Sequence, residues 1–154
     1  MNNKLLVAGL LIWAVVASSA AAYYYNGYVQ EARLVDSYRS IVGKYMIRVS
    51  ILIEYGNGTK VWHNDTLIPV GFTVLNATMS VADVKYVVGQ YGAFVTSING
   101  VKNDKGRSLY WIYWVWSNGK WVPGSVASDK YVLRDGEIFA WTYSNTANWP
   151  PPPP

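Results

Sequence analysis

The fold is decided by the segment YWIYWVW at Tyr110–Trp116, which runs into the turn sequence Ser117–Lys120. Its side chains are all aromatic or β-branched, so it predicts a β-strand that pairs in a tight hairpin with Trp121-Val122. Successive side chains of a strand point to opposite faces of the sheet. One face receives Tyr110, Ile112, Trp114 and Trp116, and the other receives Trp111, Tyr113 and Val115. Because neither face carries polar side chains, both must be covered.

Two ways of covering the two faces of this strand are consistent with the pattern. In the first, the protein covers both faces itself, with a helix on one side and loops or the neighbours Trp121 and Trp141 on the other. Cross-strand aromatic pairs would then stabilise the sheet by about 0.2–1 kcal/mol each. In the second, one face is an aromatic platform on which a sugar, corrin or peptide surface stacks.

The segments that precede this strand predict a hairpin followed by a helix. Tyr45–Tyr55 is rich in β-branched residues and predicts a mostly buried strand, and Thr59–Asp65 returns from it after the turn Gly56–Gly58. Helical spacing then follows at Val74, Thr78, Val81, Lys85 and Val88. With Ser80-x-x-Asp83 as a capping signal, we expect one helix or two short ones that end near Gly89 or Gly92.

Further strands are predicted after this helix. Phe94–Ile98 is one, and the turn Asp135-Gly136 is expected to close a hairpin between Lys130–Leu133 and Glu137–Tyr143. This order of elements predicts the α+β class, with a β-grasp-like mixed sheet packed on one helix and an N-terminal hydrophobic helix before it.

The first 22 residues predict either a cleaved signal peptide or a membrane anchor. Lys4 precedes the uncharged run Leu5–Val16, and the small residues Ala17–Ala22 follow. Residues 5–22 are also just long enough to cross a bilayer, and Tyr23–Tyr25 would suit its interface. Residues 23–45 are predicted to form an amphipathic stalk. Both alternatives make the rest of the chain extracytoplasmic, either secreted or anchored to the outer face of the cell membrane.

The remaining chain divides into a domain at 46–144 and a proline-rich tail at 145–154, predicted to form a polyproline II segment. The domain contains three N-x-[ST] sequons, which are typical of exported glycoproteins. Their acceptors are Asn57, Asn64 and Asn76.

Composition argues against catalysis. The 154 residues include eight Trp and 13 Tyr but no Cys and a single His, so disulfides, thiol nucleophiles and His-pair metal sites are excluded. No Ser/His/Asp order or phosphate-cradling glycine loop occurs, and we expect no catalytic or metal-binding residues. The net charge of +4 comes from scattered basic residues rather than a clustered stripe, so we expect no nucleic-acid partner.

An ordered set of motifs resembles a family. The segment Gly92–Val101 (GAFVTSINGV) resembles the signature of a domain-of-unknown-function family similar to the C-terminal β-grasp domain of transcobalamin and intrinsic factor. Segments similar to that family's follow in its order at Pro69–Ala77, Asn118–Lys120 and Ser128–Gly136. The stretch Tyr55–Thr59 resembles archaeal cell-surface members.

The resemblance implies which residues would contact a ligand. They are Phe94, Ser97, Asn99, Tyr110, Trp111, Tyr113, Trp114, Trp116 and Trp121. Cobalamin as a ligand follows from the resemblance alone, and the residues themselves indicate no cofactor.

Two functions remain open at this point. The first is a non-enzymatic extracytoplasmic binding module that presents its aromatic hairpin to a small corrinoid-like or glycan ligand, or to a cell-surface protein. The alternative is a structural subunit of a cell surface or extracellular filament, a homo-oligomer assembled by strand addition.

Overall fold

The computed structural model describes residues 3–154 and divides the chain into two compact units, which meet between Lys44 and Tyr45. Each unit is described by itself. The first is a helix, and the second contains all the strands and one further short helix.

The N-terminal unit is one uninterrupted helix, α1 (Asn3–Tyr45), and none of its described residues is buried in the protein. By length and composition it could cross a membrane, a test that a signal sequence near an N-terminus also passes. At 1.5 Å per residue its 43 residues span about 65 Å, roughly twice the thickness of a bilayer's hydrocarbon core. Residues 3–22 and 23–45, which belong to two different predicted segments, are thus parts of the same helix.

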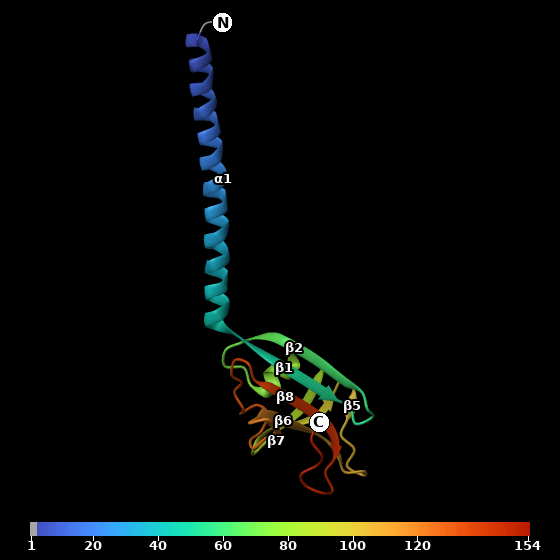
Figure 1. Ribbon diagram of the computed structural model, residues 1–154. Helices are drawn as coiled ribbons and strands as arrows, with labels where there is room; N and C mark the ends of the chain where they lie inside the picture. Colours follow the sequence, from blue (N-terminus) through green and yellow to red (C-terminus); the bar gives the residue numbers. More distant parts are fainter. Residues whose placement is uncertain (1–2) are drawn as a thin grey trace. The chain divides into compact units, whose positions relative to one another are not determined.

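The second unit is built on a five-stranded mixed sheet with the strand order β2-β1-β8-β6-β7 (Figure 1). Its strands are β1 (Met46–Glu54), β2 (Lys60–Pro69), β6 (Leu109–Ser117), β7 (Lys120–Pro123) and β8 (Ile138–Asn145). The central strand β8 runs parallel to β1 and antiparallel to β6, whereas the outer pairs are antiparallel.

A smaller antiparallel sheet and a short helix complete this unit. The sheet has the order β3-β4-β5, with β3 (Val84–Gly89), β4 (Gly92–Ile98) and β5 (Val101–Lys102). The helix α2 (Val74–Met79) begins at Thr73, whose side chain accepts a hydrogen bond from the Asn76 backbone in a reciprocal capping box.

The main core lies on the face of β6 that carries Trp111, Tyr113 and Val115. These side chains pack with Phe139 and Trp141 of β8 and with buried residues of α2 and β4. The opposite face carries a smaller cluster in which Trp114 packs with Leu52 and Ala140, and its indole Nε1 donates to Thr142 Oγ1 at 2.9 Å. The protein therefore supplies covering for both faces of β6.

The predicted fold class is confirmed: an apolar N-terminal helix precedes a mixed α+β unit. The predicted β6–β7 hairpin is also present, and both Asn118 and Gly119 have positive φ, as a two-residue type I′ turn requires. The predicted hairpin at Gly56–Gly58 pairs β1 with β2.

Two element predictions are wrong. The helical spacing does not extend past Met79, because Val84–Gly89 pairs with β4 as strand β3, and Ser80 is the C-cap of α2 rather than the start of a helix. No hairpin forms between Lys130–Leu133 and the last strand. Only Val132 makes an isolated bridge, to Thr73, because β8 takes β1 and β6 as its partners.

Candidate functional site

The candidate site is a gap between β4 and β6, where the two sheets approach each other. Strand β5 pairs with β4 only at Ser97 and Ile98, and β7 pairs with β6 only from Trp114 to Ser117. The first halves of β4 and β6 therefore have no neighbouring strand on the sides that face each other. Side chains and loops fill this space instead.

One amide side chain closes an end of the gap. Asn103 donates from Nδ2 to the Val95 carbonyl at 2.8 Å and accepts at Oδ1 from the Trp111 N–H at 3.1 Å. Its own backbone N–H donates to the Thr96 carbonyl at 3.0 Å. Asn103 thus connects the small sheet to the large one across the gap.

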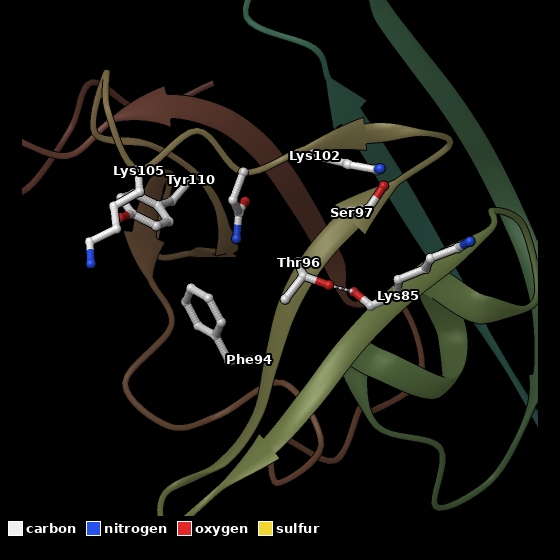
Figure 2. A pocket seen from close by; sticks show the side chains of 8 residues that line it. Lys85, Phe94, Thr96, Ser97, Lys102, Lys105 and Tyr110 are labelled. Atoms are coloured by element: carbon white, nitrogen blue, oxygen red, sulfur yellow. Dashed lines mark hydrogen bonds between the residues drawn. The ribbon is translucent and has the colours of Figure 1, made fainter.

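Beside Asn103 lies a cavity of about 560 Å³, here termed the basic hollow. Its lining residues are Lys85, Phe94, Thr96, Ser97, Lys102, Asn103, Lys105 and Tyr110. The Phe94 and Tyr110 rings make a tilted contact, with their centroids 6.1 Å apart and their planes at 57°, and Lys105 extends beside Tyr110 (Figure 2).

The charge of the basic hollow is uncompensated. No carboxylate lines it, and within residues 3–154 its lysines, Lys85, Lys102 and Lys105, form no ion pair. Phe94 is 48% exposed, so an aromatic surface and three cationic groups are open to solvent in the same place. This combination suits a ligand that has both a flat apolar part and an anionic group.

A second, smaller space, the deep cleft, shares Phe94 with the basic hollow and has a volume of about 170 Å³. Its lining residues are Ala93, Phe94, Val95, Trp111, Ile112, Tyr113, Gly124, Ala127, Ser128, Trp141 and Trp149. Trp149 of the C-terminal tail also borders an apolar surface with Phe94, Tyr110 and Ile112. Residues 145–154, predicted as a detached polyproline tail, therefore contribute to the walls of the site, and Pro151 is buried.

The loop that carries Gly124–Asp129 is held to both strands. The Tyr113 hydroxyl donates to the Val126 carbonyl, and the Asp129 Oδ1 accepts from the Ala93 N–H at 2.8 Å. Burial raises the pKa of Tyr113 to about 12, so its hydroxyl stays protonated and keeps donating at neutral pH. The Ala93 N–H, with a smaller contribution from Lys130, holds the pKa of Asp129 below its usual 3.8.

Stability at low pH is expected to depend on Asp129. Because the pKa of this carboxyl is lower in the folded protein, the stabilisation is present above about pH 4 and is lost as the pH falls through the lowered value. When thermal unfolding is measured from pH 6 to pH 2, the melting temperature should therefore decline less steeply in Asp129→Asn than in the wild type. Identical pH profiles would show that the ionisation of Asp129 does not contribute to stability.

The structure brings together only part of the predicted ligand-binding set. Phe94, Ser97 and Tyr110 line the basic hollow, and Trp111 and Tyr113 are core residues at the wall of the deep cleft. Asn99 lies in a turn, where its side chain bonds to the Tyr55 hydroxyl and the Asp83 N–H.

The other three predicted ligand-binding residues lie elsewhere. Trp114 is buried in the smaller cluster, and Trp116 packs against Trp121 at the hairpin end with ring centroids 5.2 Å apart. None of these three lines either space.

Sequence reasoning missed the three lysines, Ser128 and Trp149. Lys102 and Lys105 lie in the densest basic segment of the chain, which was the available signal for these two lysines.

The three predicted glycosylation acceptors are exposed: Asn57 in a turn, Asn64 on β2 and Asn76 on α2. Within residues 3–154 no group of three or more His, Asp or Glu is placed to hold a metal ion.

Residues 71–145 match the model of a family described as "Domain of unknown function (DUF4430)". The matched range includes the lining of the basic hollow and that of the deep cleft except for Trp149. The predicted resemblance to a domain-of-unknown-function family is confirmed over this range, whereas the archaeal cell-surface relationship stays a prediction. No curated protein matches the chain.

The chain also matches several solved structures, two of which follow. One is the crystal structure of haptocorrin in complex with Cbi, with 19% identity and a TM-score of 0.52, over 64% of this chain and 25% of haptocorrin. The other is a protein from Ruminococcus gnavus ATCC 29149 named for an inferred metal-binding property, with 18% identity and a TM-score of 0.47, over 62% of this chain and 94% of that one. The chain spans about a quarter of the length of haptocorrin, and the similarity to it shows a shared fold.

Proposed function

We propose that this chain is a non-enzymatic, extracytoplasmic binding module that takes a small anionic ligand with a flat apolar part between β4 and β6. The basic hollow carries the proposal, since three lysines without carboxylate partners line the same cavity as the rings of Phe94 and Tyr110. A haptocorrin-like fold supports a role in small-ligand binding, and the apolar helix α1 supports export or anchoring. The three exposed sequons support the same compartment.

The charge of the ligand can be tested with a matched pair of probes. The full chain in detergent micelles is titrated with indole-3-acetate and with the neutral indole-3-acetamide, and binding is followed by ligand-observed NMR. Two charges about 4 Å apart in water attract by about 1 kcal/mol, which corresponds to roughly fivefold in affinity per lysine. We therefore expect the carboxylate to bind at least tenfold more tightly than the amide.

Variants locate this preference in the basic hollow. The double substitution Lys102→Gln, Lys105→Gln should reduce it to the roughly fivefold that Lys85 can supply, and the matched control Lys120→Gln, at the β6–β7 turn, should leave it unchanged. Equal binding of both probes to the wild type, or a preference that the double substitution does not reduce, would contradict the proposed function. Cobinamide in the same titration tests whether a corrinoid is among the ligands.

The exposed edge strand β3 favours a second candidate, a subunit that assembles by strand addition. β3 pairs only with β4, and Val87 and Val88 on it are 57% and 74% exposed. Apolar edge strands of this kind pair readily with another chain. Sedimentation velocity should then show oligomers that Val88→Lys removes, whereas monomers at high concentration would contradict assembly.

A further inference from the structure

The deep cleft contains a buried hydroxyl that nothing in the protein satisfies. Ser128 lines the cleft and is 2% exposed, and its Oγ is the one buried side-chain oxygen or nitrogen without a hydrogen-bond partner among residues 3–154. Native proteins rarely leave such a group unpaired, and an orphaned hydroxyl at the wall of a cavity calls for an explanation.

The other buried side-chain polar groups at the walls of the cleft are already paired. Trp111 Nε1 donates to the Val101 carbonyl, and Trp141 Nε1 donates to Thr78 Oγ1. The Tyr113 hydroxyl donates to the Val126 carbonyl. A group that enters the cleft therefore meets apolar ring surfaces, the buried unpaired hydroxyl of Ser128 and, at the exposed rim, the indole of Trp149.

The size of the cleft limits what can enter. A cavity of about 150 Å³ lined by apolar side chains holds one benzene molecule, and the deep cleft measures about 170 Å³. A sugar ring of this size would bring several hydroxyl groups to a site with only one buried unpaired partner for them. A flat ring with one polar substituent matches both the space and the hydrogen-bonding capacity.

We propose that the deep cleft binds a single aromatic ring that carries one hydrogen-bonding substituent, as in a phenol, with that substituent on Ser128 Oγ. This deepens the proposed function and rests on it, because Phe94 lines both the deep cleft and the basic hollow. The ring and the anionic group are then two parts of one ligand that contacts Phe94 in both spaces.

The proposal is tested with a pair of probes that differ only in the substituent. The full chain in detergent micelles is titrated with 4-fluorophenol and 4-fluorotoluene, observed by fluorine NMR. We expect the phenol to bind about tenfold more tightly to the wild type. Ser128→Ala should bind both probes equally, and the exposed neighbour Ser125→Ala should keep the preference.

The melting temperature of the unliganded protein gives a second readout. Ser128→Ala should leave it unchanged or raise it, because an unpaired hydroxyl is removed from an apolar site. A lower melting temperature together with an unchanged preference for phenol would overturn the proposal and make Ser128 a structural residue. Absence of binding by either probe would also overturn it.

The two proposals fail separately. If the fluorinated rings show no Ser128-dependent preference while indole-3-acetate still depends on Lys102 and Lys105, the ring site is wrong and the proposed function stands. If the protein prefers the phenol but does not prefer the carboxylate, the proposal of an anionic ligand in the basic hollow is wrong instead.

Discussion

Replacing Gly92 with alanine is expected to lower the free energy of unfolding by about 4 kcal/mol, for two reasons that add. Gly92 has a φ of +118°, a backbone conformation that residues with a side chain avoid. A methyl group there would also lie 2.5 Å from Asp129 Oδ1 and 2.7 Å from the Ala127 side chain. The loop beside the deep cleft would have to move away from β4, which breaks the Asp129–Ala93 bond.

Gly89, at the other end of the β3–β4 turn, provides the control. It has an ordinary φ, and the nearest atom to an added methyl group is 3.9 Å away. Urea unfolding of the full chain, followed by tryptophan fluorescence, should place Gly89→Ala within about 1 kcal/mol of the wild type. A Gly92→Ala protein as stable as Gly89→Ala would show that the loop does not need this close approach.

The second large effect is expected from Gly124→Ala, with a loss of about 3 kcal/mol. An alanine Cβ at this position would overlap the ring of Tyr113, which packs face-on against the glycine backbone. The ring cannot retreat, because its hydroxyl is bonded to Val126 and its other side contacts Trp141 at 5.6 Å between centroids. The deep cleft should be distorted as well, so phenol binding should weaken together with stability.

Gly106→Ala is the matched control for this substitution. Its φ is ordinary, and the closest atom to an added methyl group is Asp104 Oδ1 at 3.4 Å, an ordinary contact. Equal stability of the Gly106→Ala and Gly124→Ala proteins would mean that the Tyr113 ring adapts without cost. The packing against Gly124 would then not determine the shape of the cleft.

Local chemistry explains which parts of the fold were predictable. The β6–β7 hairpin follows from Asn118-Gly119, two residues that adopt the positive φ of a type I′ turn. The segment at Val84–Gly89 was misread because the sequence VKYVVG satisfies helical spacing and strand propensity at once. The segment is a strand because it pairs with β4, and this pairing is a tertiary contact that the local sequence does not contain.

The candidate site was predictable only where one strand supplies it. Phe94 and Ser97 share β4 with the family-like segment, and Tyr110 begins the aromatic strand. The lysines come from β3, β5 and the following loop, so only the folded chain places them together. Ser128 and Trp149 have no local signal, since the burial of an unpaired Ser128 hydroxyl and the position of Trp149 at the cleft are both properties of the folded chain.

The Asn103 amide sets how far apart the two walls of the site stand. Its nitrogen donates to Val95 on β4, and its oxygen accepts from Trp111 on β6. An aspartate at this position could not donate to the Val95 carbonyl, and a leucine could make neither hydrogen bond. Near the basic hollow the two sheets are thus joined by the Asn103 side chain and by Trp111 Nε1, which donates to the Val101 carbonyl, while the far end is held by the Asp129 carboxylate and the loop it belongs to. We expect the thickness of an acceptable ligand to be strict beside Asn103 and more permissive toward Ser128. Selectivity would then differ between the two spaces of the site.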